Sequence, residues 1–225
     1  MVWATPFRSM AVSMIAMIIV VGFVLASCGG RGNRGGDSDI SYKIKMITEE
    51  AGEVFVGLVG SGDATIDWGD GSDKVTLTLS EKWPRIEHTY PSASIHTITI
   101  TGDNITGFGC SDSKVTSLDV SRCTELSVFG CYNNRLTSLD VSQNIALTFL
   151  KCTNNQLTSL DMSKNPALTE LHCESNRFSS AALNTLFGTL NSNSVEGEKG
   201  IYIEDNPGYE SCDKSIATNK GWSVL

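Results

Sequence analysis

The stretch that decides the fold is residues 147–168. It reads Leu147-x-x-Leu150-x-Cys152-x-x-Asn155-x-Leu157-x-x-Leu160, followed by Asp161-Met162-Ser163-Lys164-Asn165. The same string occurs 21 residues earlier and again 21 residues later, and a weaker copy begins at Ile105. A fixed period of this length indicates units that bury their apolar face only by stacking on one another. The sequence therefore predicts a stack of four similar units.

Within each unit the apolar side chains at positions 4 and 6, such as Leu150 and Cys152, lie two residues apart. This spacing puts both on one face of a strand. Stacking then gives two inward rows, Phe108, Phe129, Leu150 and Leu171 beside Cys110, Cys131, Cys152 and Cys173. The Asn at position 9 is expected to bond unpaired backbone groups in the turn after the strand. Ser113 occupies this position in the first unit, which therefore looks like an edge.

This pattern resembles the leucine-rich-repeat family, L-x-x-L-x-L-x-x-N-x-L, with Cys at one usual Leu position. The resemblance implies a short solenoid over residues 104–180. A helical stripe with a Ser179 N-cap follows, and Ile201, Ile203 and Asn206 then repeat the strand motif. Residues 181–225 are therefore expected to form a helix-containing C-terminal cap.

The first 28 residues are expected to be a targeting segment. Arg8 is the only charged residue before Cys28, and residues 11–25 are apolar, too short a run for a membrane span. Leu25-Ala26-Ser27-Cys28 resembles the lipobox of bacterial lipoproteins, which implies a signal peptide over 1–27 and a Cys28 that carries the lipid, palmitate included. The alternative is an ordinary secretory signal cut near Ala26.

Residues 28–39 contain five glycines and no apolar side chain after Cys28, which predicts a flexible tether. The lipid anchor would place the chain at the bacterial outer membrane, with the cell surface as the expected side. The sequence leaves open whether the chain faces the periplasm or the exterior.

Residues 40–103 alternate with period two, which predicts six short strands, and six short strands favour a small β-sandwich. The expected ranges are 41–47, 53–59, 64–68, 74–79, 85–90 and 96–101. Asp67-Trp68-Gly69-Asp70-Gly71-Ser72, followed by His88-Thr89-Tyr90, resembles the PKD-type immunoglobulin-like domain, which is usually a spacer or adhesion module. The whole fold is thus expected to be mainly β, with the sandwich packed on the open end of the solenoid.

Several polar groups allow two interpretations. Asp67, Asp70 and Asp73 could bind calcium or only form the turn. Asp119, Asp140 and Asp161 would stack as an acidic row, available to a cation or receptor or engaged in turn capping. The four repeat cysteines are expected to be reduced, because stacked strands hold them in parallel rather than facing each other. Whether Cys123 and Cys212 are paired stays open.

The best candidate for function is the concave side of the solenoid, the usual binding surface of repeat proteins. Its expected partner-binding residues combine aromatic, aliphatic and charged side chains: Val128, Tyr132, Phe149, Lys151, Glu170, His172, Glu174 and Tyr202. The expected function is non-enzymatic protein binding or adhesion to an extracellular or envelope protein or glycan. The alternative is a structural spacer without a specific ligand.

Other classes of function find little support in the sequence. The net charge of −8 and the lack of a basic block argue against nucleic acid as a partner. His172 and Cys173 are strand neighbours that point to opposite faces, so they cannot act as base and nucleophile. A linear row of cysteines does not converge on zinc. No catalytic residue, metal or cofactor is therefore expected.

Overall fold

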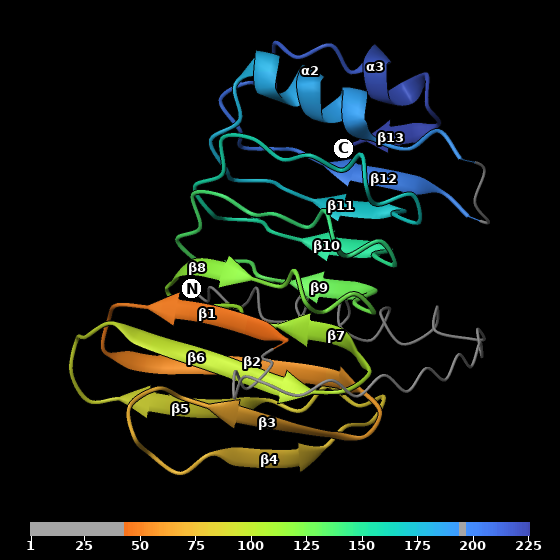
Figure 1. Cartoon of the computed structure of the whole chain (residues 1–225). Helices are drawn as coiled ribbons and strands as arrows, with labels where there is room; N and C mark the ends of the chain where they lie inside the picture. Colours follow the sequence, from red (N-terminus) through yellow and green to blue (C-terminus); the bar gives the residue numbers. More distant parts are fainter. Residues whose placement is uncertain (1–42, 194–196) are drawn as a thin grey trace, which may run out of the picture. The chain divides into compact units, whose positions relative to one another are not determined.

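The computed structural model describes residues 43–193 and 197–225, which belong to one compact unit, Ile40–Leu225. The predicted signal peptide, Cys28 and the tether lie outside the described residues. Most of the regular secondary structure in this unit belongs to two sheets, one of five strands and one of eight, so the described chain is mainly β (Figure 1). Within the described ranges, no helix has the length and apolar character needed to span a bilayer.

The N-terminal part contains six strands: β1 (Ile44–Thr48), β2 (Gly52–Gly60), β3 (Asp63–Asp67), β4 (Val75–Thr78), β5 (Ile86–Tyr90) and β6 (His96–Gly102). Each lies within three residues of its expected range. Alternate side chains point into the core, as period-two patterning requires, and Ile44, Ile66 and Ile100 are fully buried. β1 and β3 both pair antiparallel with β6, which is how these three side chains meet.

Each repeat contributes one strand to a parallel sheet: β7 (Ile105–Gly109), β9 (Val128–Gly130), β10 (Phe149–Lys151) and β11 (Glu170–His172). β12 (Lys199–Tyr202) and β13 (Trp222–Val224) extend this sheet in the same direction. The register puts the side chains at position 4 in one continuous inward row, in which none is exposed: Phe108, Phe129, Leu150, Leu171 and Ile201.

The N-terminal part and the repeats share both sheets. β2 pairs antiparallel with β7, and β8 (Val115–Asp119) pairs antiparallel with β1. The expectation that Ser113 marks a weak edge is wrong. Its hydroxyl accepts a hydrogen bond from the Phe55 N–H at 2.8 Å and lies 3.3 Å from the Phe55 carbonyl oxygen. The hydroxyl also lies 2.9 Å from the Ser111 carbonyl oxygen, so a small side chain here bonds its own turn and β2, where no preceding repeat is present.

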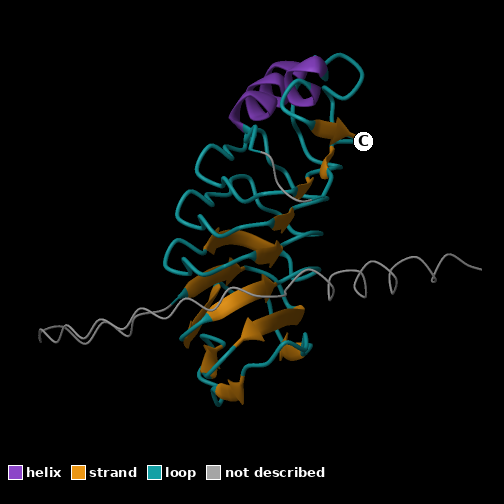
Figure 2. Ribbon diagram, turned by 90° about the vertical axis from the view of Figure 1, so that its right-hand side faces the viewer, coloured by secondary structure: helices purple, strands orange, loops and turns teal. Residues whose placement is uncertain are grey.

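The C-terminal end is covered by α2 (Ser180–Thr189) and α3 (Ser215–Thr218), which Figure 2 shows together at one end of the stack. The Ser179 side chain caps α2 by accepting a hydrogen bond from the Ala182 N–H. Leu183, Leu186 and Phe187 form the inner face of this helix and are fully buried. The last inward row of the repeats is thereby removed from water.

A buried asparagine ladder joins the turns of successive repeats. The Asn155 amide donates to the carbonyl oxygens of Cys131 and Cys152 at 2.9 and 3.1 Å, and its oxygen accepts from the Leu136 N–H at 3.0 Å. Asn134, Asn176 and Asn206 make the same kinds of bond in their own turns. The position-9 asparagines therefore satisfy backbone groups that a turn leaves unpaired, as expected.

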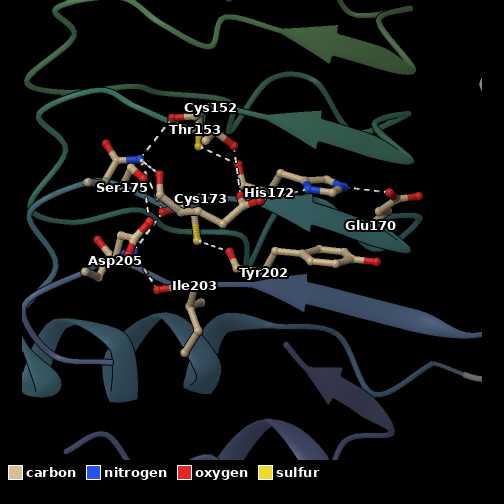
Figure 3. A network of polar contacts seen from close by, with 12 residues as sticks. Cys152, Thr153, Glu170, His172, Cys173, Ser175, Tyr202, Ile203 and Asp205 are labelled. Carbon is tan, nitrogen blue, oxygen red and sulfur yellow. Dashed lines mark hydrogen bonds and ion pairs between the residues drawn. The ribbon is translucent and has the colours of Figure 1, made fainter. Parts of the chain in front are cut away.

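The repeat cysteines form a buried row of free thiols. The Cys152 thiol donates to the His172 carbonyl oxygen and the Cys173 thiol to the Tyr202 carbonyl oxygen, both at 3.4 Å (Figure 3). Burial raises the pKa of Cys152 to about 12 and holds the pKa of Cys173 well above its usual range. These sulfurs therefore remain protonated and pack as small apolar side chains. Cys123 and Cys212 are also free.

The residue before each ladder asparagine has left-handed backbone geometry. Asn133, Asn154 and Ser175 have φ values of 56°, 53° and 52°. The Asn154 amide donates to the Asn133 oxygen at 2.9 Å, so the first two form an exposed side-chain ladder. Ser175 interrupts this ladder, and serine tolerates the left-handed region less readily than asparagine does.

We therefore expect Ser175→Asn to raise the free energy of unfolding by about 0.5–1 kcal/mol, since it relieves the backbone and can extend the ladder. Urea denaturation measures this change. Ser175→Ala is the control: like Ser175→Asn it removes the hydroxyl that donates to Asp205 at 3.3 Å, but it keeps an unfavourable residue and adds no donor. Equal stability of the two variants would contradict the explanation.

Candidate binding face

The eight predicted binding residues lie on one side of the parallel sheet, opposite the buried rows. Strand register places Val128 beside Phe149, Phe149 beside Glu170, and Lys151 beside His172, with Tyr202 next in line. We call this surface the outer sheet face, made of Val128, Tyr132, Phe149, Lys151, Glu170, His172, Glu174 and Tyr202. Side chains alternate along each strand, so the residues between the buried positions point to this face.

Val128 and Phe149 lie side by side on neighbouring strands, and each is partly covered by other side chains. The Phe149 ring lies 5.5 Å from the His172 ring, centroid to centroid. Cross-strand neighbours on a parallel sheet are close enough for such large side chains to cover one another. The aromatic groups therefore form a packed layer rather than isolated anchors.

His172 is the centre of this layer. Its Nε2 lies 2.6 Å from Glu170 Oε1 and its Nδ1 lies 3.3 Å from Glu174 Oε1. Its ring stacks on Tyr202 with a centroid distance of 4.1 Å and an interplanar angle of 4°. Figure 3 shows the imidazole between Glu170 and the strand, with the Tyr202 ring alongside. Thr153 donates to the other oxygen of Glu174 at 2.8 Å, which fixes that carboxylate.

The electrostatics of the cluster follow from these contacts. Burial alone lowers the pKa of His172, but the hydrogen bonds to Glu170 and Glu174 outweigh burial and leave this pKa raised. Burial acts to raise the pKa of Glu174, but bonds from His172, the backbone and Thr153 leave it lowered. The cluster therefore favours a protonated imidazole held between carboxylates.

This arrangement predicts a stability loss at mildly alkaline pH. A raised folded-state pKa contributes stability that is fully present below the ordinary value of 6.5 and is lost as the pH rises through the folded value. We expect the melting temperature of the wild type to fall more than that of His172→Gln between about pH 6 and pH 9. Melting temperatures that change with pH by the same amount in both proteins would contradict this expectation.

Trp83 is a residue of this face that the sequence reasoning missed. It lies in the loop between β4 and β5, yet its ring covers glycines of β2 and β7 on the same side as Val128. An ideal Cβ at Gly107 would lie 2.9 Å from Trp83 Cζ2, and one at Gly57 would lie 3.2 Å from Cε3. Glycines at outward strand positions often mark a close approach of another group. These glycines were the sequence feature that could have indicated a ring packed on the sheet.

Most of the remaining candidate groups are engaged within the protein, whereas Asp73 is exposed. Asp67 binds Lys74 and the Gly69 N–H, and Asp70 binds Ser72 and His88. Asp140 and Asp161 accept from the Ser142 and Ser163 N–H groups, as turn capping requires, and Asp119 does the same with Ser121. Across the part of the chain that the structure describes, no three His, Cys, Asp or Glu side chains gather so as to hold a metal ion.

His172 and Cys173 point to opposite sides of β11. The Cys173 side chain is fully buried, whereas His172 lies on the outer sheet face. The pair therefore has the geometry expected of successive strand residues and cannot form a thiol–imidazole couple.

Comparison with known proteins gives a limited result. No protein-family model and no curated protein matches this sequence. Among solved structures, the chain is similar to the functional domain of InlJ from Listeria monocytogenes, which includes a cysteine ladder, with 30% sequence identity and a TM-score of 0.42. The similarity covers 53% of this chain and 25% of that chain. The chain thus spans about a quarter of the length of the protein that it matches.

Proposed function

We propose that this chain is a non-enzymatic, lipid-anchored protein of the bacterial outer membrane that binds a protein or glycan partner through the outer sheet face of a leucine-rich-repeat solenoid. The observation that carries the proposal is the aromatic layer of that face. The rings of Phe149 and Tyr202 each contact the His172 ring, and the Glu170 and Glu174 carboxylates hold His172 in place. Rigid aromatic groups of this kind bind partners at little entropic cost.

The N-terminal part is, in this proposal, a PKD-like spacer. What supports this is a contact between its two sequence markers: the Tyr90 hydroxyl donates to the Trp68 carbonyl oxygen at 2.6 Å, and His88 stacks on Trp68. With both sheets shared across the junction, such a spacer would hold the repeats at a fixed orientation.

The binding proposal is tested with the double variant Phe149→Glu, Tyr132→Glu of the full chain. We expect binding to extracellular proteins or arrayed glycans to fall at least about tenfold, because the two charges disrupt the aromatic layer. Ile145→Glu is the matched control, since Ile145 is 61% exposed and lies outside the outer sheet face. If wild type and control bind nothing in either assay, the chain is a structural spacer.

The anchor is tested with Cys28→Ser. Wild type should incorporate a palmitate analogue and partition into detergent, whereas Cys28→Ser should do neither. Cys212→Ser is the matched control because Cys212 is the free cysteine that is not fully covered among those described. Labelling of the Cys28→Ser protein would refute the anchor.

A further inference from the structure

The Trp83 ring packs on a part of the sheet where glycines leave no side chains. Gly57, Gly107 and Gly109 all lie under its ring, at ideal Cβ distances of 3.2, 2.9 and 3.6 Å from ring atoms. Any side chain at Gly107 would displace the indole, whereas Trp83 as a whole remains partly exposed. One face of the ring therefore lies against the sheet, and the rest of the ring is available to a second apolar surface.

Open space begins next to Trp83. Gly130 pairs in register with Gly109 on one side and with Lys151 on the other. An ideal Cβ at Gly130 would meet no atom within 4 Å, so a side chain or ligand atom has room there. β7 and β10 lie two strand spacings apart, roughly 10 Å, with β9 between them. That width accommodates one six-membered ring, not the broad contact of a folded partner.

The ammonium group of Lys151 lies beside this space. Lys151 Nζ lies 5.1 Å from the centre of the Tyr132 ring, and none of the ion pairs among the described residues includes Lys151. The nearby carboxylates of Glu170 and Glu174 are already bound to His172. A half-buried ammonium group beside an open aromatic surface favours an anionic group.

We propose that this place binds a single acidic sugar, a pyranose ring that carries one carboxylate. We call it the Gly130 site, made of Gly130 with Trp83, Tyr132 and Lys151 around it. The pyranose ring lies over Gly130 with its C–H groups against the part of the indole next to Gly109, and the carboxylate reaches the Lys151 ammonium. The net charge of −8 disfavours a polyanion by long-range repulsion, so one terminal acidic residue fits better than a polysulfated chain. This inference rests on the proposed function and names its partner class.

The test titrates the full chain with sialyllactose, with lactose as the matched neutral probe and glucuronic acid as a second acidic ring. Acrylamide quenching of tryptophan reports the site in a Trp3→Phe background, because Trp68 and Trp222 are each only 1% exposed, which leaves Trp83 as the accessible one among the described residues. We expect sialyllactose to protect Trp83 at millimolar concentration and lactose to bind about tenfold more weakly.

Two variants locate the contact. Gly130→Leu fills the open space and should abolish protection, and Lys151→Gln should weaken sialyllactose binding about tenfold while leaving lactose unchanged. Lys164→Gln is the matched control, since Lys164 is exposed and lies away from the sheet. Unchanged melting temperatures of the variants exclude loss of the fold as the cause.

The outcomes separate this inference from the proposed function. Equal binding of lactose and sialyllactose, an unaffected Lys151→Gln protein, or no binding of either acidic probe overturns the acidic-sugar site. If the Phe149→Glu, Tyr132→Glu variant still loses a protein partner in that case, the proposed function stands and only its ligand class is wrong. If glucuronic acid binds as tightly as sialyllactose, the site recognises the carboxylate of the sugar ring, whichever glycan carries it.

Discussion

Replacing Asn155 with alanine is expected to lower the free energy of unfolding by about 3 kcal/mol. The side chain belongs to the buried ladder, and its oxygen is the acceptor for the buried Leu136 N–H. The carbonyl oxygens of Cys131 and Cys152 keep bonds from the asparagines of the neighbouring repeats, but the Leu136 donor loses its partner. An unsatisfied buried N–H accounts for most of the loss, and the cavity adds the rest.

Urea denaturation of the two proteins measures this change, and a melting temperature about 6–12 °C lower should accompany it. Thr158→Ala in the same repeat is the control, because Thr158 is exposed and its truncation should stay within about 0.5 kcal/mol. A loss below 1 kcal/mol for Asn155→Ala would mean that water or a shifted backbone replaces the amide.

The ladder could be predicted from sequence because it depends on local geometry that every repeat shares. Position 9 follows the strand by a fixed number of residues, so an Asn there reaches the same backbone groups in each unit. The core rows were predictable for the same reason, since strand alternation and a 21-residue period determine which side chains stack. Mainly β structure and the six N-terminal strands follow from the same alternation.

The position of Trp83 could not be predicted in this way. Its loop belongs to the N-terminal part, and its place above Gly107 depends on the pairing of β2 with β7, residues about 50 positions apart along the chain. No local period records that pairing. Ser113 was misjudged for the same reason, since its partner Phe55 comes from β2. Contacts between the N-terminal part and the repeats become visible only in the three-dimensional structure. Contacts within the repeats can be predicted from sequence, because every repeat has the same local geometry.

We expect Phe108→Ala to lower the free energy of unfolding by about 3–5 kcal/mol and to destabilise both halves of the described chain together. Phe108 is fully buried, and its ring stacks on Phe129 with a centroid distance of 5.7 Å. Its strand, β7, is hydrogen-bonded to β2 of the N-terminal part and to β9 of the repeats. The cavity therefore opens beneath the junction, where no apolar side chain from either half can fill it without moving a shared sheet.

Native-state hydrogen exchange at Ile66 in β3 and at Leu171 in β11 measures this coupling. Both amides should lose protection by the same free energy in Phe108→Ala, because unfolding either half would expose the shared strands. Phe178→Ala is the matched control: it removes an equally buried ring near the C-terminal end. If the repeats unfold one by one, as stacked units can, Phe178→Ala would lower protection at Leu171 and leave Ile66 unchanged. Equal effects at both amides in both variants mean that the shared sheets make one cooperative unit, whereas a Phe108→Ala effect confined to Leu171 would show that the junction does not couple the two halves.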